Sequence, residues 1–370
     1  MTGDSIERAG RGGPARRSEL RDLMRAFLRE QTSLAESDQD TFEWTSVTTA
    51  DGLPHTWIYD LFEDSNGTIW VGTWGGGLAR FDGRTWTTYS KRDGLASNAV
   101  TSIREDSRGR LWIGTDRGLT LYDGQRFTKA GLTGKSILTL HVDGDDNVWA
   151  GTWRSRLTGG GLHRYDGQRW ESYGKRDGLP GVEILKVFED SRGRIWIGTY
   201  DHGNGAGVGC WDGTRWQNFR VEDGLLDNCV YSMFEDPDGR MWFGTLAGVS
   251  VYDGRDWYRM TTADGLVHDR VYAMLIDAEQ TMWFGTEGGV SRYDGRDWTS
   301  YTADGELVDD LVRSILQDRD GGLWFGTYPF APGYGGISIA RKPAQRDSLE
   351  QKAARYLPQR PAREINPGTS

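Results

Sequence analysis

A four-residue motif, Trp-x-Gly-Thr, recurs seven times along the sequence and constrains the fold more than any other feature. Neighbouring copies lie 37 to 47 residues apart, at Trp70–Thr73, Trp112–Thr115, Trp149–Thr152, Trp196–Thr199, Trp242–Thr245, Trp283–Thr286 and Trp324–Thr327. A repeat of about 40 residues with aromatic and glycine signatures is typical of a β-propeller, in which each repeat is a blade of four short strands. The sequence therefore predicts an all-β fold, a seven-bladed propeller.

The second repeat shows how one blade can be read from the sequence. Val100–Ile103 is its first expected strand, Leu111–Thr115 its second and Leu119–Tyr122 its third, and a fourth includes Phe127. An Asp-Gly-Leu loop such as Asp93–Leu95 leads from one blade to the next, and Asp and Gly are suited to tight turns.

The last repeat ends near Ala340 without a fourth strand, and a matching segment stands at the other end of the chain. Residues 42–47 precede the first Asp-Gly-Leu as Trp86–Tyr89 precede the second. We therefore expect this N-terminal strand to complete blade seven beside residues 337–340, which leaves no open sheet edge. The expected domains are a disordered arm and amphipathic helix over 1–41, the propeller over 42–341, and a tail over 342–370.

Composition limits the classes of partner. Only 36% of the residues are hydrophobic, but 17 Trp, 15 Tyr and 12 Phe can bury enough area for a core. A net charge of −10 argues against nucleic acid or an anionic membrane as the main partner. No apolar run reaches the ~20 residues of a membrane span and no signal peptide is evident, so a cytoplasmic location is expected. Cys210 and Cys229 are expected to be buried thiols.

The order of motifs within each blade resembles the two-component regulator propeller repeat. Asp-Gly-Leu is followed by Val-x-Ser-Ile-x-Glu-Asp-x-x-Gly, Trp-Ile-Gly-Thr and Tyr-Asp-Gly, except that Ala130-Gly131-Leu132 of the third blade lacks the aspartate. The resemblance covers about 300 residues and implies a seven-bladed propeller. Larger members of that family are sensor histidine kinases whose periplasmic propellers recognise ligands, often oligosaccharides. This sequence contains no kinase segment, so the resemblance implies sensing by analogy only.

Most conspicuous side chains belong to the repeat itself and are interpreted as scaffold. Thirteen tryptophans on the second and fourth strands of the blades are expected to pack between blades. Glu-Asp pairs such as Glu63-Asp64 and Glu189-Asp190 resemble paired catalytic carboxylates, but they recur at the same turn in four blades. That recurrence favours a role in the turn.

Aromatic residues outside the repeat pattern indicate a ligand site. Trp57, Trp74 and Trp153 fit no repeat position, and the longer loops after Trp-x-Gly-Thr open with Trp74, Trp153, Tyr200 and Tyr328. We expect two aromatic walls at one mouth of the channel, where they can stack on sugar rings or merely cover the apolar mouth. The predicted ligand-binding residues are Trp57, Trp74, Trp153, Tyr200 and Tyr328, with His55, His202, His268, Asn98, Glu183, Asp269 and Arg270 as polar neighbours.

Three interpretations of function stay open at this point. The first is a non-catalytic propeller that binds an oligosaccharide-like or other small ligand at this loop face, within a signalling system. The second is a metal-dependent lyase similar to virginiamycin B lyase, also a seven-bladed propeller, using the three loop histidines and Glu183. The third is a protein-interaction scaffold that uses the underside and a helix expected at residues 18–34. No nucleophile motif, phosphate loop or metal-ligand spacing is present, so neither cofactor nor metal is expected and recognition without chemistry is favoured.

Overall fold

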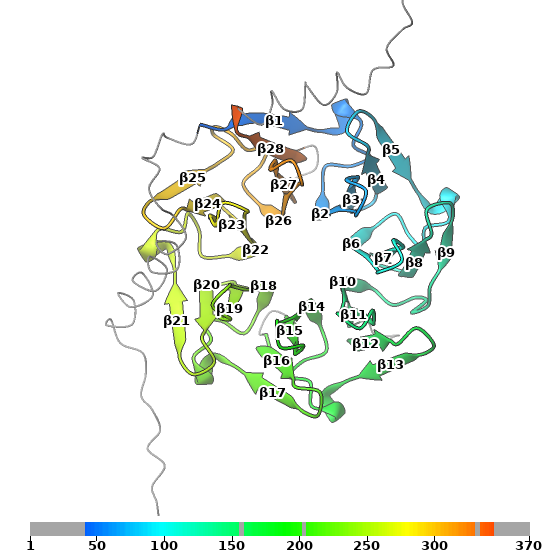
Figure 1. The fold of residues 1–370 in the computed structure, drawn as a ribbon, viewed down its shortest axis with the longest axis vertical. Helices are drawn as coiled ribbons and strands as arrows, with labels where there is room; N and C mark the ends of the chain where they lie inside the picture. The colour runs from blue at the N-terminus through cyan, green and yellow to red at the C-terminus, as the bar shows by residue number, and fades with distance from the viewer. Residues whose placement is uncertain (1–40, 155–158, 202–204, 330–333, 344–370) are drawn as a thin grey trace, which may run out of the picture.

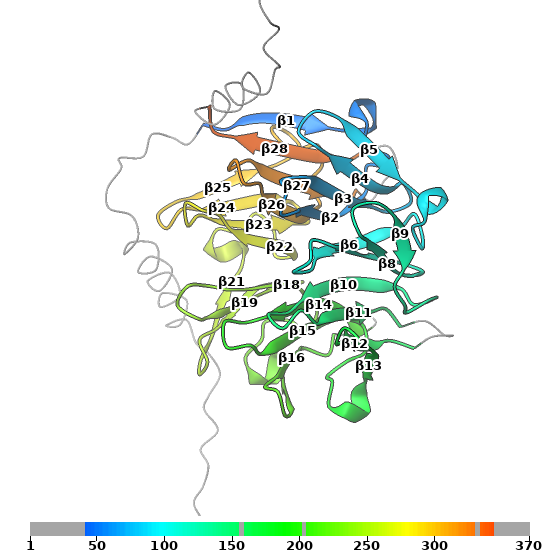
Figure 2. The same cartoon turned by 45° about the vertical axis from the view of Figure 1, so that its right-hand side comes forward.

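The computed structural model describes residues 41–154, 159–201, 205–329 and 334–343. The arm and helix expected over 1–41 and the tail expected over 342–370 lie outside the described residues, apart from residues 41, 342 and 343. The described residues form seven four-stranded antiparallel sheets around a central opening (Figure 1). Turning the molecule by 45° shows the sheets side by side around the ring (Figure 2). The predicted seven-bladed propeller is confirmed.

In each blade, the first strand of the repeat lies nearest the axis (Figure 1). These innermost strands are β2 (Ile58–Glu63), β6 (Val100–Glu105), β10 (Ile137–Val142), β14 (Ile184–Glu189), β18 (Val230–Glu235), β22 (Val271–Ile276) and β26 (Val312–Gln317). The second strands carry the Trp-x-Gly-Thr motifs and are β3 (Ile69–Thr73), β7 (Leu111–Thr115), β11 (Val148–Thr152), β15 (Ile195–Thr199), β19 (Met241–Thr245), β23 (Met282–Thr286) and β27 (Leu323–Thr327).

The two outer strands complete each sheet. The third strands are β4 (Gly77–Phe81), β8 (Gly118–Tyr122), β12 (Gly161–Tyr165), β16 (Val208–Trp211), β20 (Gly248–Tyr252), β24 (Gly289–Tyr293) and β28 (Ile337–Arg341). At the rim lie β5 (Trp86–Tyr89), β9 (Phe127–Lys129), β13 (Trp170–Tyr173), β17 (Trp216–Phe219), β21 (Trp257–Met260), β25 (Trp298–Tyr301) and β1 (Glu43–Val47).

The ring is closed by its first strand, as the sequence predicts. Strand β1 pairs antiparallel with β28, with Glu43 opposite Arg341 and Val47 opposite Ile337. The Trp44 ring lies 5.0 Å from that of Tyr301 in blade six. The N-terminal strand therefore supplies both the missing edge of blade seven and part of its packing against blade six.

Each residue of the Asp-Gly-Leu loop has a different structural role, as blade two shows. Its η2 segment (Lys91–Asp93) is a single 3-10 turn, and the Asp93 carboxylate accepts hydrogen bonds from the N–H of Ser90 at 2.8 Å and from its hydroxyl. Gly94 then adopts a φ of +112°, a left-handed conformation that favours glycine. Leu95 is buried in the core between blades. The same turn forms η1 (Thr49–Asp51), η3 (Lys175–Asp177), η5 (Val221–Asp223) and η6 (Thr262–Asp264).

The Glu-Asp pairs serve the turns, which confirms the interpretation of these carboxylates as structural. In every blade, the Asp accepts a hydrogen bond of 2.7–2.9 Å from the indole N–H of the tryptophan six residues later. The Glu links blades: Glu105 accepts from the N–H and hydroxyl of Ser65 in blade one, each at 2.7 Å. Neither carboxylate of the pair is available for chemistry.

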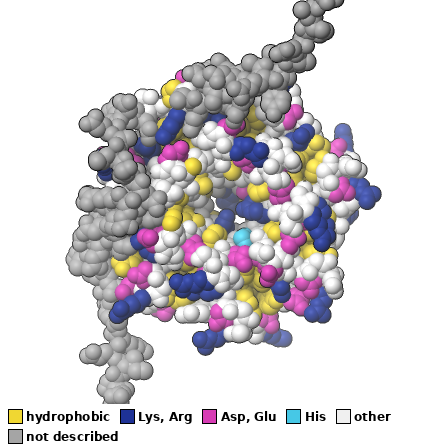
Figure 3. All heavy atoms as spheres, viewed as in Figure 1, with side chains coloured by type: hydrophobic (Ala, Val, Ile, Leu, Met, Phe, Trp, Pro, Cys, Tyr) yellow, Lys and Arg dark blue, Asp and Glu magenta, His cyan; other side chains and the backbone are white. Residues whose placement is uncertain are grey.

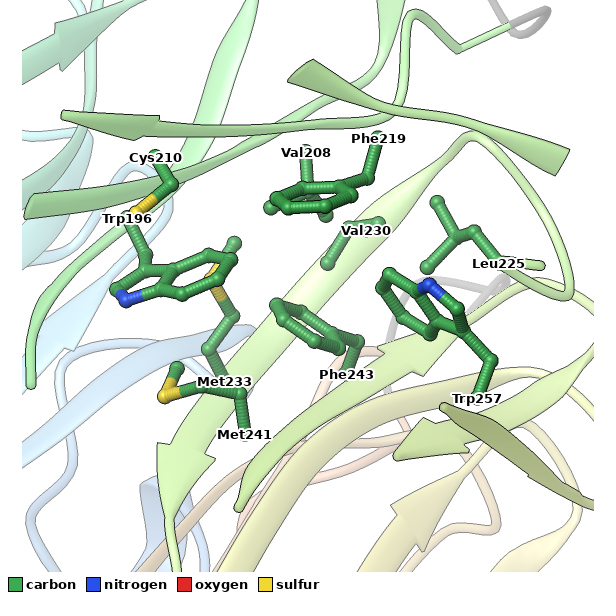
Figure 4. Packing of buried hydrophobic residues seen from close by; sticks show 10 residues of the cluster. All are labelled: Trp196, Val208, Cys210, Phe219, Leu225, Val230, Met233, Met241, Phe243 and Trp257. Atoms are coloured by element: carbon green, nitrogen blue, oxygen red, sulfur yellow. The ribbon is translucent and has the colours of Figure 1, made fainter. Parts of the chain in front are cut away.

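The core consists of apolar clusters that lie between neighbouring blades. Between blades four and five, Trp196 packs against Phe219 and Phe243, with ring centroids 5.9 and 5.6 Å apart (Figure 4). The tryptophans of the second strands thus pack between blades as predicted. Cys210 is buried in the same cluster and Cys229 is buried nearby. Their burial is as the sequence predicts. It raises the pKa of both thiols to about 12, so both are unreactive.

Candidate ligand-binding site

The innermost strands of all seven blades line a cavity of about 300 Å³ at the centre of the disc. Figure 3 shows this central opening from the direction of Figure 1, with basic side chains visible inside it. The volume is at the lower end of the range of small-molecule sites. The channel can therefore hold a small ligand or one unit of a longer one.

A β-bulge in each innermost strand decides which side chains reach the channel. The pairing register shifts between the first and third residues of all seven strands. Such a bulge interrupts the alternation of side chains and re-aims them. As a result, the second and third residues of every innermost strand both line the cavity, for example Tyr59 and Asp60 in β2 and Leu185 and Lys186 in β14.

Blades seven and one contribute a group of rings that we call the first aromatic arc: Trp57, Tyr59, Trp74 and Tyr328. Tyr59 is central to it, because its ring centroid lies 5.1 Å from that of Trp74, in a stack, and 5.1 Å from that of Tyr328, edge-on. Trp57 lies 4.8 Å from Tyr328. The N–H of Trp74 donates to the Trp57 carbonyl at 3.0 Å. All four residues are half-buried, so part of each remains accessible.

Blades three to six contribute the second aromatic arc: Trp153, Tyr200, Tyr231 and Tyr272. Successive ring centroids are 5.4, 6.2 and 5.0 Å apart. The Tyr272 hydroxyl donates to a carboxylate oxygen of Glu287 at 2.8 Å, which fixes the end of the series. The structure thus brings the five predicted aromatic residues into two groups, three in the first arc and two in the second.

Arg313 of β26 lies near both arcs. Its guanidinium carbon is 4.4 Å from the Tyr59 ring centroid and 5.7 Å from that of Tyr328. Burial raises the pKa of Tyr231 and of Tyr272, and the positive charge of Arg313 opposes this rise at both phenols. Arg313 is therefore within electrostatic reach of both arcs.

The predicted histidines stabilise loops. The Nδ1 atom of His55 accepts from the N–H of Trp57 at 3.0 Å, and that of His268 accepts from the N–H of Arg270 at 3.1 Å. Burial lowers the pKa of His55. These bonds hold the loops on which Trp57 and Arg270 stand. His202 lies outside the described residues.

The other predicted polar residues are held by local contacts. The side chains of Asn98 and Asp269 accept hydrogen bonds from the N–H groups of Lys91 at 2.8 Å and Thr262 at 2.7 Å, at the preceding 3-10 turns. Arg270 forms an ion pair of 2.8 Å with Glu287. Glu183 is fully buried, which corrects its placement among the accessible polar residues of the mouth.

Four residues of this site are not among those predicted from the sequence: Tyr59, Tyr231, Tyr272 and Arg313. All four are the second residue of an innermost strand, where the remaining blades carry Thr101, Leu138 and Leu185. A signal was present, because tyrosine or arginine at this position departs from the apolar and small residues of the other blades. Regular alternation of side chains does not reveal that this position faces the channel, since the bulge lies there.

Charged side chains stand at the third and fifth positions of the same strands. Arg104 donates to the Asp60 carboxylate at 2.8 Å, so these two charges neutralise each other. Lys186 has no hydrogen-bond or ion-pair partner among the described residues. Burial lowers its pKa to about 8, the Arg104 charge adds to this decrease, and Asp60 opposes it.

Within the described ranges, no group of three or more His, Cys, Asp or Glu side chains is placed to hold a metal ion. His55 and His268 stand on the loops before β2 and β22, in blades one and six. None of the described helices has the length and apolar character needed to cross a membrane.

The chain matches the family described as "Two component regulator propeller" in six segments, residues 52–75, 94–117, 178–201, 224–247, 265–288 and 306–328. Each segment ends just after a Trp-x-Gly-Thr motif. The third repeat is not matched, in agreement with the missing aspartate before Gly131. No curated protein matches the chain.

Several solved structures share the fold. The extracellular domain of BT3049, described as a hybrid two component system of B. thetaiotaomicron, has a TM-score of 0.71 and 21% identity, over 82% of this chain and 42% of that one. The corresponding domain of BT4673 has a TM-score of 0.67 and 20% identity, over 81% and 40%. Virginiamycin B lyase from Staphylococcus aureus has a TM-score of 0.60 and 13% identity, over 81% and 99%. The chain thus spans less than half the length of the first two.

These comparisons correct one expectation and confirm another. The expected cytoplasmic location is wrong, because the similar propellers of BT3049 and BT4673 are extracellular domains. The resemblance in repeat motifs is confirmed, since six of the seven blades carry the family's repeat and the propeller is similar in fold to the extracellular domains of two-component systems. Six of the seven blades of this chain are therefore two-component regulator propeller repeats.

Proposed function

We propose that this propeller is a non-catalytic sensor domain that binds an oligosaccharide-like ligand at the loop face, between the two aromatic arcs. The observation that carries the proposal is the gathering of eight half-buried aromatic residues beside one opening. Flat, partly apolar faces of sugar rings stack on such rings, while hydroxyl groups take hydrogen bonds from their polar edges.

Two details of the arcs favour a ligand over a role in packing alone. The indole N–H of Trp57 is buried without a hydrogen-bond partner among the described residues, although a buried tryptophan N–H usually finds one. The Tyr59 ring lies between Trp74 and Tyr328 at stacking distance while it lines the cavity. A sugar hydroxyl would satisfy the first group and a sugar ring would cover the second.

Calorimetric titration with a panel of neutral and acidic oligosaccharides tests the proposal. A ligand present at 100 times its Kd should also stabilise the fold by about 2.7 kcal/mol. We expect Trp74→Ala to weaken binding about 5- to 10-fold, through the lost stacking, and Trp74→Phe to retain most of the affinity.

Trp298→Ala is the matched control, because Trp298 is a half-buried tryptophan on the rim strand β25. It should leave the affinity unchanged. If no oligosaccharide binds, or if Trp74→Ala binds as tightly as the parent chain, the proposed site is wrong.

A further inference from the structure

In three of the seven blades, the third residue of the innermost strand accepts a hydrogen bond from the next blade. Asp60 accepts from the N–H of Ile103 at 2.7 Å, and Ser102 accepts from that of Leu140 at 3.0 Å. Ser314 accepts from the N–H of the corresponding residue in the next blade, Leu61, at 3.1 Å. Lys186 occupies this position in β14, and an ammonium group cannot accept a hydrogen bond. Lys186 therefore does not form the link between blades that Asp60, Ser102 and Ser314 form.

Lys186 also places an unpaired cation in the channel. Among the charged residues that line the cavity, Arg104 and Asp60 pair with each other. Lys186 and Arg313 have no carboxylate within ion-pair distance among the described residues. A charge away from bulk water without a partner is unfavourable. The arrangement is the more unusual because the chain as a whole carries a net charge of −10.

Ser232 supplies a second, independent observation. It is the third residue of β18, the strand of the next blade, and thus the counterpart of Lys186. The residue lines the cavity and is only 6% exposed, and its hydroxyl oxygen has no hydrogen-bond partner among the described residues. Lys186 and Ser232 thus line the same cavity from two adjacent blades, and neither side chain has a hydrogen-bond partner among the described residues.

We propose that the channel binds an oxyanion of the ligand, the carboxylate or sulfate of an acidic sugar, with Lys186 and Ser232 as donors. The ammonium group and the hydroxyl would both donate to the anion, and a hydrogen bond to an ion is stronger than one between neutral groups. Arg313, beside both arcs, adds positive charge where the sugar would enter. This inference rests on the proposed function and names the chemical class of its ligand.

Calorimetric titration with three probes tests the inference: trigalacturonate, neutral galactotriose, and a sulfated galactose trisaccharide. We expect the anionic probes to bind more tightly than galactotriose, and their ranking tells carboxylate from sulfate. Lys186→Met should weaken binding of the preferred anionic probe about 10- to 100-fold and leave galactotriose unchanged. Ser232→Ala should weaken it less, and Lys186→Arg should keep most of the preference.

Lys129→Met is the matched control, because Lys129 is exposed on the rim strand β9 and its loss changes the net charge equally. It should leave the affinities unchanged. If galactotriose and the anionic probes bind equally, or if Lys186→Met weakens all three alike, the anion site is wrong while the proposed function survives. If none of the probes binds, the anion site is contradicted, and the wider oligosaccharide panel decides the proposed function. Thermal unfolding of each variant establishes that it is folded.

Discussion

At the scale of single residues, the repeat is held by one carboxylate per blade. Asp236 is 3% exposed, and it accepts from the indole of Trp242 at 2.8 Å and from the N–H of Arg240 at 2.9 Å. It also forms an ion pair of 2.6 Å with the Arg240 side chain. These bonds explain why aspartate and tryptophan recur six residues apart in every blade.

Replacement of this carboxylate should be costly. We expect Asp236→Ala to lower the free energy of unfolding by about 3–5 kcal/mol, because the buried indole and backbone donors lose their acceptor and Arg240 loses one of its two carboxylate partners. Asp145→Ala is the control, since Asp145 is exposed in the equivalent turn of blade three, and it should change stability by less than about 0.5 kcal/mol. Denaturant unfolding measures both. Equal effects of the two substitutions would contradict this account of the turn.

Lys186 should oppose folding, as residues kept for binding often do. Burial and the Arg104 charge lower its pKa to about 8, and the Asp60 charge opposes this decrease. In the unfolded chain the pKa keeps its ordinary value near 10.5. Between pH 8 and 10.5 the unfolded state binds more protons than the folded state, so the free energy of unfolding rises with pH. We expect Lys186→Met to be more stable than the parent chain at pH 7, by about 1 kcal/mol or more, with the difference narrowing between pH 8 and 10.5. Thermal unfolding across this range measures the difference, and a less stable Lys186→Met would show that the lysine is structural.

At the scale of elements, the ring depends on strand β1. Deletion of residues 1–47 removes β1, leaves β28 as an open edge and takes Trp44 from its packing against Tyr301 and Phe325. We expect this deletion to lower the unfolding temperature and to promote aggregation through the exposed edge. Deletion of residues 1–41 is the control, because it keeps the strand. Thermal unfolding and light scattering compare the two, and equal behaviour would mean that closure by β1 contributes little.

Much of this architecture is predictable from the sequence, because each repeat element has a local physical cause. The Asp-Gly-Leu turn, the hydrogen bond between tryptophan and aspartate, and the unmatched terminal strand can each be recognised from recurring residues in the sequence. The channel wall is less predictable, since the bulges re-aim Tyr59 and Lys186 and strict alternation of side chains no longer applies. The burial of Glu183 was missed for a related reason: its position on a loop suggested accessibility, but only tertiary packing decides it.

At the scale of the whole molecule, the two arcs are rigidly related because closed blades hold them around one channel. The first arc belongs to blades seven and one and the second to blades three to six, which places β2 and β26 across the opening from β14 and β18 (Figure 1). A ligand whose anion lies at Lys186 and whose rings extend toward the mouth can therefore touch both arcs at once.

Hydrogen exchange tests whether both arcs engage one ligand. We expect trigalacturonate to slow amide exchange in the loops that carry Trp74 and Tyr328 and in those that carry Trp153 and Tyr200, because binding suppresses local opening on both sides. The turns at the far ends of β2 and β14, which carry Asp64 and Asp190, should be unaffected and serve as internal controls. Protection of the loops of one arc alone would contradict simultaneous contact with both arcs. The site would then lie on one side of the mouth only.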